Sequence, residues 1–334
     1  MSISPTAWRR VVALTAGRAM LVTDLHGDKD AYDRYRDRFL TLQARGEADH
    51  LIIAGDLIHH SGPAGADRSV EMVLDLFRLQ EEVGAENIIY LLGNHELPHI
   101  YAITLQKGDE LFTPRFEKKM GRERERILSR FRQLPFYLVT PGGVTVTHAG
   151  ATNAIGERSG TQRLFNFSHT DVLDAARVTI TEKTRPALQR AVSRMYGRPY
   201  SELMQTLFGV TDPADPRYED FLVGALATTG NEDFDLLWSA LFNRNEKEYG
   251  NQIYKMVLRT MLQTLSPAEM PQQVMVTGHM DCRGGYKLVN SQQLRIASAK
   301  HAHPREAGVY LLWDVTKKIS HAEQLVPYLH SVFS

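Results

Sequence analysis

Hydrophobic and polar positions divide the first half of the chain into short apolar runs separated by amphipathic stretches. The apolar runs at 19–23, 51–54, 88–92 and 144–147 have the length and composition of buried strands. In the stretches 30–43, 69–83 and 122–132, apolar residues recur at three- and four-residue spacing, which predicts helices. Strands and helices that alternate along a chain are typical of an α/β fold.

The pattern changes in the second half of the chain. From Arg158 to Leu265 it is mainly helical, with turn residues at Gly197, Pro199, Pro213 and Pro216. Strand-like runs return at 274–277, 294–297 and 309–313. We therefore predict a single domain over residues 1–334, in which residues 155–268 form a mainly helical insertion.

Composition and charge narrow the class of protein. The 39 basic and 39 acidic side chains cancel, so bulk charge gives no indication of nucleic-acid or membrane binding. The single cysteine, Cys282, cannot form an internal disulfide, which favours a reducing compartment. The longest apolar run near the start, 11–14, is too short for a signal-peptide core. We expect a cytoplasmic protein that binds neither nucleic acid nor a membrane, and its oligomeric state stays open.

Polar side chains capable of binding metal follow the predicted strands. Ligands of open α/β sheets lie beyond the carboxyl ends of the strands, so these positions are the first candidates for a site. They are Asp24 and His26, Asp56, Asn94 to Glu96, His148, and, after a later strand, His279. Carboxylate and amide oxygens mixed with imidazole nitrogens suit borderline divalent metals, and the number of candidate ligands favours two ions.

The motifs around these residues resemble those of the calcineurin-like metallophosphoesterases and, within them, the phosphoprotein phosphatases that include bacterial-type serine/threonine phosphatases. The matching blocks are Asp24-Leu25-His26, Gly55-Asp56, Gly93-Asn94-His95-Glu96 and Thr147-His148-Ala149-Gly150. The segment Asp235-Leu236-Leu237-Trp238-Ser239 also resembles that branch. The resemblance implies a central β-sandwich flanked by helices.

The resemblance also implies a role for each candidate. One ion would be held by Asp24, His26 and Asp56, and a second by Asp56, Asn94, His148 and His279. The ions are expected to be manganese, iron or zinc. A hydroxide bridging the two ions, with Asp56 as the bridging carboxylate, would attack phosphorus. His95 would then protonate the leaving alkoxide, Asn94 would also contact the substrate, and Glu96 would orient its surroundings.

The chain departs from the family pattern at the residues that hold phosphate. His59 and His60 stand where the family has an Asp-Arg pair. We interpret His59 as orienting His95 and His60 as contacting the substrate, against the alternative that both are solvated loop residues. Arg244 is the counterpart of a second phosphate-binding arginine, and Arg283 is a rival candidate.

Four further residues near the final metal histidine have an ordinary structural interpretation. Asp281 stands where many members of the wider family have a second histidine, and we expect it in a loop or in contact with a ligand. Cys282 is expected to be an inert buried thiol. For His301 and His303 an exposed loop is favoured over a third metal site.

These observations predict a dinuclear metal-dependent phosphatase that hydrolyses phosphomonoesters, first of all phosphoserine and phosphothreonine in proteins or peptides. A small phosphoester is also a possible substrate. One alternative with the same chemistry is hydrolysis of nucleotides or dinucleoside polyphosphates. A second alternative, from another class, is a non-catalytic phosphate-binding scaffold.

Overall fold

The computed structural model describes residues 8–107, 110–155, 158–243, 245–267 and 269–333. The chain divides into two compact units, which are described separately. The first unit consists of Met1–Asn94, Leu134–Phe167 and Leu236–Ser334, and the second of His95–Gln133 and Ser168–Asp235. No helix in the described part of the chain is both long and apolar enough to span a bilayer.

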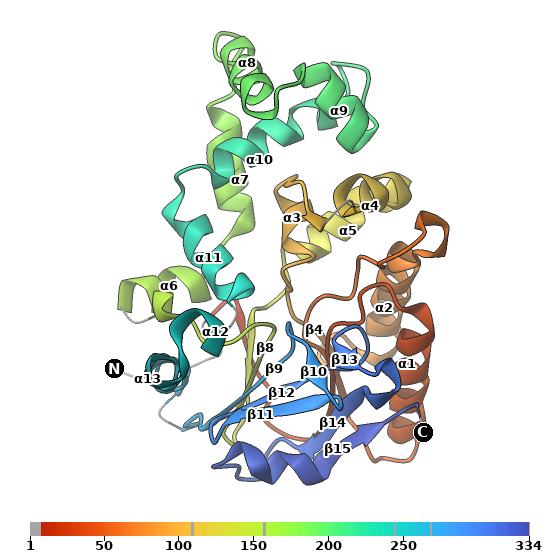
Figure 1. Ribbon diagram of the computed structural model, residues 1–334, viewed down its shortest axis with the longest axis vertical. Helices are drawn as coiled ribbons and strands as arrows, with labels where there is room; N and C mark the ends of the chain where they lie inside the picture. Colours follow the sequence, from red (N-terminus) through yellow and green to blue (C-terminus); the bar gives the residue numbers. More distant parts are fainter. Residues whose placement is uncertain (1–7, 108–109, 156–157, 244, 268, 334) are drawn as a thin grey trace. The chain divides into compact units, whose positions relative to one another are not determined.

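The first unit contains two β-sheets. Within the described residues, one sheet has the strand order β1-β7-β8-β9-β12-β11 and the other β15-β14-β2-β3-β4 (Figure 1). The strands of the first sheet are β1 (Val11–Ala13), β7 (Tyr137–Val139), β8 (Val144–Thr147), β9 (Val274–Thr277), β11 (Tyr286–Asn290) and β12 (Gln293–Ile296). Those of the second are β2 (Arg18–Val22), β3 (His50–Ile53), β4 (Ile88–Tyr90), β14 (Val309–Asp314) and β15 (Leu329–Ser331). The short strands β10 (Cys282–Arg283) and β13 (Ala302–His303) pair with each other.

One continuous hydrophobic core joins the two sheets. Leu21 and Ile52 from the second sheet lie in the same buried cluster as Val146, Val276 and Leu294 from the first. All five side chains are shielded from solvent. The predicted central β-sandwich is therefore confirmed.

Parallel pairing places several strand ends at one edge of each sheet. In the second sheet β2 pairs in parallel with β3, and β3 with β4. In the first sheet β8, β9 and β12 are parallel to one another. Because parallel strands end at the same edge, the loops that follow β2, β3 and β4 are neighbours, as are those that follow β8, β9 and β12.

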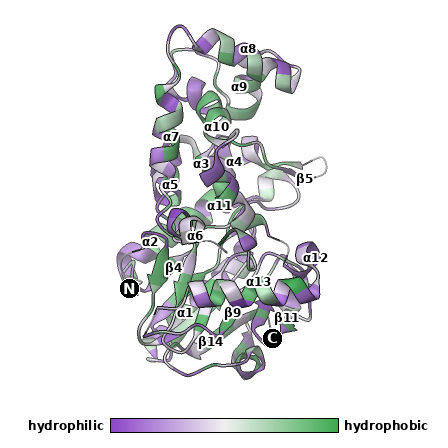
Figure 2. Ribbon diagram, turned by 90° about the vertical axis from the view of Figure 1, so that its left-hand side faces the viewer, coloured by the Kyte–Doolittle hydropathy of each residue, from purple (hydrophilic) through white to green (hydrophobic). Residues whose placement is uncertain are grey.

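The helices of the first unit are α1 (Lys29–Ala44), α2 (Ser69–Val83), α6 (Arg158–Phe165), α12 (Glu246–Tyr249) and α13 (Asn251–Thr264), and α11 (Glu232–Phe242) crosses the boundary between the units. Figure 2 shows α13 with hydrophilic and hydrophobic residues in alternation. Its buried residues Tyr254, Leu258 and Met261 recur at three- and four-residue spacing, the pattern of a helix with one buried face.

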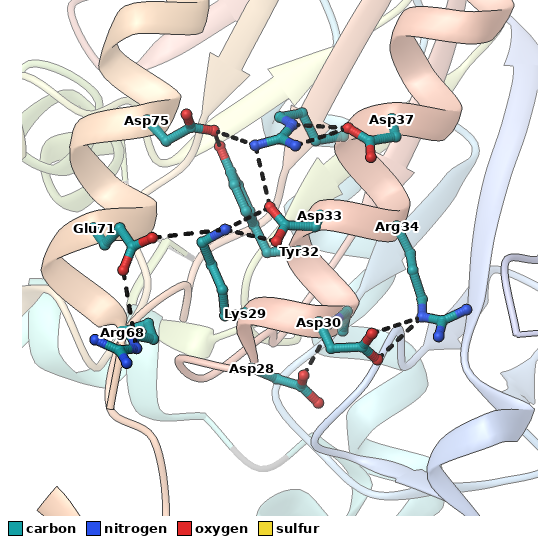
Figure 3. A network of polar contacts seen from close by, with 12 residues as sticks. Asp28, Lys29, Asp30, Tyr32, Asp33, Arg34, Asp37, Arg68, Glu71 and Asp75 are labelled. Carbon is teal, nitrogen blue, oxygen red and sulfur yellow. Dashed lines mark hydrogen bonds and ion pairs between the residues drawn. The ribbon is translucent and has the colours of Figure 1, made fainter. Parts of the chain in front are cut away.

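Polar contacts fix α1 against α2 (Figure 3). The Tyr32 hydroxyl donates to Asp75 Oδ2 over 2.9 Å, and Arg36 donates to the same oxygen over 2.9 Å. Lys29 Nζ lies 3.8 Å from Glu71 Oε1 on α2. This network holds the amino-terminal half of α1, and with it the loop between β2 and α1.

The second unit is helical and has a core of its own. Its helices are α3 (Leu97–Ile100), α4 (Phe112–Met120), α5 (Arg124–Phe131), α7 (His169–Val178), α8 (Arg185–Tyr196), α9 (Tyr200–Phe208) and α10 (Asp220–Thr228), and its short strands are β5 (Gln106–Lys107) and β6 (Glu110–Leu111). Leu203, Met204, Phe208 and Phe221 are among the buried residues of this core. The helices between Arg158 and Leu265 agree with the pattern of the sequence, while the boundaries of the insertion stay a prediction.

A buried ion network lies within the second unit. Arg124 donates to Glu117 Oε2 over 2.7 Å and contacts Asp220 Oδ2 at 2.9 Å. Burial alone would raise the pKa of Glu117, but a hydrogen bond from His99 and the charge of Arg124 outweigh it and lower the pKa. Arg124 thus links α5 to α4 and α10 within the second unit.

Candidate metal centre

The candidate ligands lie on the loops that leave the parallel strands of the sandwich. In the second sheet Asp24 and His26 follow β2, Asp56 follows β3, and Asn94 follows β4. In the first sheet His148 directly follows β8, and His279 lies two residues beyond β9. Asp24, Asp56 and His148 are almost completely buried, whereas His279 is half-buried. The two sheets therefore present these residues from their carboxyl edges, as the sequence predicts.

The backbone at four of these ligands is in the left-handed region. The φ angles are +51° at Asp24, +46° at His26, +52° at Asp56 and +68° at His279. Non-glycine residues seldom adopt this conformation, which costs about 1–3 kcal/mol per residue and concentrates at functional sites. The strained backbone lowers the stability of the fold, and in return it orients these four side chains.

Glycines leave the space that the ligands occupy. A Cβ atom on Gly278 would come within 2.1 Å of Asp24 Oδ2. A Cβ atom on Gly55 would come within 2.7 Å of His148 Nδ1, and Gly55 also has a positive φ of +82°. The glycine of the Gly55-Asp56 pair therefore leaves room for His148, and the glycine of the Gly278-His279 pair leaves room for Asp24.

The Asp56 carboxylate lies between two histidines from different sheets. Its Oδ2 atom is 3.5 Å from His26 Nε2 and 3.5 Å from His148 Nε2. The ligating atoms of Asp56, His148 and His279 all lie within 4.8 Å of one another. One carboxylate oxygen that faces both histidines is in the position of a bridge between two ions.

The hydrogen bonds of His148 show that this group fits a metal ion. His148 Nδ1 lies 2.9 Å from the Ala54 carbonyl oxygen, which can only accept, so Nδ1 carries the proton. The lone pair of Nε2 then faces Asn94 Oδ1 at 2.7 Å. Two lone pairs this close repel each other unless both bind a shared cation, and neighbouring ligands of one metal ion are about 3 Å apart.

Hydrogen bonds between loops fix the Asp24 carboxylate. The His279 backbone N–H lies 3.0 Å from both of its oxygens. The His26 N–H donates to the Asp56 carbonyl oxygen over 2.8 Å, and the Gly278 N–H donates to the His148 carbonyl oxygen over 3.0 Å. The loops are therefore joined to one another before any ion binds.

Comparison with known families shows which family has this arrangement of ligands. The sequence profile of the calcineurin-like phosphoesterases matches residues 17–205, more than half of the chain, from Asp24 through His148. The chain is a calcineurin-like phosphoesterase. This family uses a dinuclear metal centre, and the Asp56 and His148 geometry described above supplies candidate ligands for it. A search of curated protein sequences gave no match.

Solved structures give only weak likenesses to the phosphoesterase. A cold-active protein tyrosine phosphatase is 14% identical, with a TM-score of 0.48 over 93% of this chain and 76% of that one. A serine/threonine phosphatase from Saccharomyces cerevisiae is 12% identical, with a TM-score of 0.47 over 91% of this chain and 76% of that one. A putative diadenosine tetraphosphatase is 25% identical, with a TM-score of 0.28 over 42% of this chain and 55% of that one. With TM-scores below 0.5, none of these structures indicates the substrate of this chain.

The residues expected to act beside the metal ligands divide between the two units. His95 is the first residue of the second unit and directly follows Asn94 along the chain. Its ring centroid lies 5.9 Å from that of Phe112 within the same unit. Glu96 is buried next to it, where α3 begins. Their predicted roles as proton donor and orienting group stay predictions.

His59 and His60 have different surroundings within the first unit of the phosphoesterase. His59 is 1% exposed, has a φ of +76°, and its N–H donates to Ser69 Oγ over 2.9 Å. The interpretation of His59 as a solvated loop residue is therefore wrong, because the loop turns its side chain inward. His60 is half-buried and lines a hollow beside His26.

That hollow has a volume of about 290 Å³. Its lining consists of Leu25, His26, Asp28, His60, Ser61, Ala299, Lys300, Ala302, His303 and Arg305. Lys300 Nζ donates to the neutral hydroxyl of Ser61 over 2.9 Å, whereas Arg305 is paired with Asp28 over 2.6 Å. The hollow thus combines apolar surface with imidazole groups, the Lys300 ammonium and the ion pair of Arg305 with Asp28.

Arg244 and Arg283 are the two arginines predicted as candidates for binding phosphate. Arg244 lies outside the described residues. Arg283 is an exposed residue of β10. Cys282 is buried, and burial raises the pKa of its thiol to about 12, which agrees with an inert thiol.

Sequence reasoning missed His301. Its interpretation as an exposed loop residue is wrong, because the side chain is half-buried and Nε2 lies 3.9 Å from Asp24 Oδ1. The ligating atoms of Asp24, His26 and His301 all lie within 4.8 Å of one another. The only signal in the sequence is that His301 lies on the loop after β12, a strand parallel to β9, but the loop carries it past the strand end before it turns back to Asp24.

Proposed function

We propose that this phosphoesterase is a dinuclear metal-dependent phosphatase that hydrolyses phosphomonoesters, with phosphoserine and phosphothreonine of proteins or peptides as substrates. The observation that carries the proposal is the Asp56 carboxylate oxygen, 3.5 Å from Nε2 of both His26 and His148. When bound, two divalent ions lower the pKa of water and clamp phosphoryl oxygens. A carboxylate placed between two histidines is what holds such a pair of ions together.

Each side chain has a distinct task in this proposal. Asp24 and His26 hold one ion, Asn94, His148 and His279 hold the other, and Asp56 serves both. The buried left-handed backbone keeps these groups oriented before the substrate arrives. Orientation of this kind removes part of the entropic barrier of the reaction.

His95 is the proposed proton donor to the leaving oxygen. It follows Asn94 directly, so the chain itself places it next to a ligand of the second ion. Proton transfer by a positioned side chain contributes about 100- to 10,000-fold to a rate. The proposed role of Glu96 is to orient the groups around it.

Preference for phosphoserine and phosphothreonine rests on two observations. The Gly93-Asn94-His95-Glu96 block resembles that of the phosphoprotein phosphatases. Beside His26, the hollow that contains His60 and Lys300 offers donors for the phosphate and apolar surface for the residues around it. In this proposal His60 contacts the substrate in place of the family's arginine.

The activity is tested by hydrolysis of p-nitrophenyl phosphate with metal-stripped protein, to which manganese, iron, zinc and magnesium are added singly. We expect metal-restored turnover in the wild type and none in Asp56→Ala. Bound metal without turnover of any phosphoester would contradict the proposal and favour a phosphate-binding scaffold.

Substrate class is tested by comparing a phosphothreonine peptide with a dinucleoside tetraphosphate. We expect the larger kcat/KM for the peptide. A preference for the dinucleoside tetraphosphate would refute the phosphoprotein assignment and leave the metal-dependent phosphoesterase standing.

The role of His95 predicts a dependence on the leaving group. His95→Ala is expected to retain its metal and to lose more activity on a phosphopeptide, whose alkoxide needs a proton, than on p-nitrophenyl phosphate. Metal content and both kcat values are measured on the same preparation. Full activity of the variant on the phosphopeptide would remove His95 from the mechanism.

A further inference from the structure

The loop that follows β12 brings His301 to the edge of the candidate metal centre. The Lys300 backbone N–H donates to the Asp24 carbonyl oxygen over 3.2 Å, which fixes the loop beside Asp24. The ring of His301 stands edge-on to that of His26, with 5.2 Å between their centroids. A histidine beside two candidate ligands of one ion is of the residue type to be a third ligand.

The distances fit a shared ion. His301 Nε2 lies 3.9 Å from Asp24 Oδ1, and the ligating atoms of Asp24, His26 and His301 are within 4.8 Å of one another. Divalent metals bind imidazole nitrogen and carboxylate oxygen at about 2.0–2.2 Å, so three ligands of one ion are mostly about 3–4 Å apart. Small side-chain rotations therefore suffice to bring the ligating atoms of Asp24, His26 and His301 to binding distance of one ion.

Asp281 sets the orientation of the imidazole ring. Its Oδ1 atom lies 2.7 Å from His301 Nδ1, and a carboxylate can only accept, so Nδ1 carries the proton. Nε2, the nitrogen left to bind a metal ion, is the one that faces Asp24. Metal-binding histidines usually donate their other N–H to a carboxylate or a carbonyl, and His148 does so to Ala54 in the same unit.

We propose that His301 is a further ligand of the ion held by Asp24 and His26, and that Asp281 is its positioning residue. The inference rests on the dinuclear centre of the proposed function. Without His301 the first ion has Asp24, His26 and Asp56, one protein ligand fewer than the second. With it, two imidazoles bind the first ion, which favours zinc, iron or nickel over magnesium at that position.

The test measures metal binding and not turnover. Manganese bound per chain is determined by equilibrium dialysis and mass spectrometry for the wild type, His301→Ala, Asp281→Asn and Asp56→Ala. We expect two ions in the wild type and a rise of at least 10- to 100-fold in the Kd of one ion in His301→Ala. Asp281→Asn is expected to raise the same Kd about 10-fold, because removal of an orienting partner weakens the ligand.

His303→Ala is the matched control. His303 Nε2 lies 3.3 Å from the same oxygen of Asp281, but His303 is exposed and lies outside the Asp24 group. We expect wild-type metal binding from this variant. The visible absorption of the cobalt-loaded proteins provides a second readout, since loss of a nitrogen ligand changes it in His301→Ala and not in His303→Ala.

The outcomes separate this inference from the function on which it rests. If His301→Ala keeps both manganese affinities and the cobalt spectrum of the wild type, His301 is not a ligand, while loss of both ions in Asp56→Ala still supports the dinuclear centre. If the wild type binds no manganese, or Asp56→Ala binds both ions, the dinuclear centre fails and the ligand role of His301 with it. The Asp281 side chain is exposed, so Asp281→Asn is expected to fold normally. This variant therefore tests the ligand role of His301 even if His301→Ala folds poorly.

Discussion

Gly278→Ala adds a single methyl group and tests whether the space beside Asp24 is required for metal binding. The new Cβ would lie 2.1 Å from Asp24 Oδ2 and 2.8 Å from Thr23 Cβ. Ordinary contacts begin at about 3.4 Å, so the carboxylate oxygen must move by more than an ångström. Ligand distances in metal sites hold to within about 0.2 Å, and a shift of this size removes Asp24 from the ion.

The expected result has two parts. The Kd of the ion held by Asp24 rises at least 10- to 100-fold, as for other disruptions around metal ligands. Overpacking in a buried site lowers the free energy of unfolding of the metal-free protein by about 1–3 kcal/mol. Metal content by mass spectrometry and urea unfolding in chelator measure the two effects separately.

Gly65→Ala is the matched control. Like Gly278, Gly65 has no positive φ, but a Cβ atom there meets nothing within 4 Å. Both measurements should match the wild type. The reasoning is refuted if Gly278→Ala binds two ions with wild-type affinity, because Asp24 would then be either dispensable or able to move without cost.

The remaining predictions concern Glu246 and Cys282. Glu246→Gln should lower the free energy of unfolding by about 1.5–3 kcal/mol at pH 7, since it leaves the charge of Arg295, 1% exposed, without its carboxylate. Lys287→Gln, at a half-exposed partner of the same carboxylate, should cost under about 1 kcal/mol. Burial raises the pKa of Glu246, but hydrogen bonds from Arg295 and Lys287 outweigh it and lower the pKa from 4.5 to about 2. Because the folded pKa lies below the unfolded one, this stabilisation is present above about pH 4.5 and is lost as the pH falls towards 2, so urea midpoints of wild type and Glu246→Gln should converge over that range. Cys282 should resist alkylation by iodoacetamide at pH 8 in the folded protein and react in urea; rapid labelling of the folded protein would contradict its burial.

Regular elements with strong patterns could be predicted from the sequence. The helix at 69–83 and the strands at 144–147 and 274–277 have the predicted bounds, because the helix has one periodic buried face and the two strands are continuously buried runs. Strands β1 and β7, of three residues each, are not among the strands that the sequence predicts. Strand β11 was missed because it is mostly exposed and lacks an apolar run.

The candidate site could be predicted where a ligand follows a strand closely, as Asp24, Asp56 and His148 do. His301 could not be found by spacing alone, because a loop and a hydrogen bond to Asp281 turn it back to Asp24. The burial of His59 also depends on tertiary contacts, among them the hydrogen bond from its N–H to Ser69. Sequence patterns report strand ends, and the folding of the loops beyond them is decided by contacts between segments far apart in the chain.

Two groups of candidate ligands, one with Asp24 and His301 and one with Asp56 and His148, draw on both sheets of the sandwich. Asp24 follows a strand of one sheet and His301 a strand of the other, and the same holds for Asp56 and His148. An ion in either position is therefore a reversible cross-link between the two halves of the hydrophobic core. By linkage, an ion at 100 times its Kd adds about 2.7 kcal/mol to the folded state. Metal supply would then govern how long the folded chain survives as well as how fast it turns over substrate.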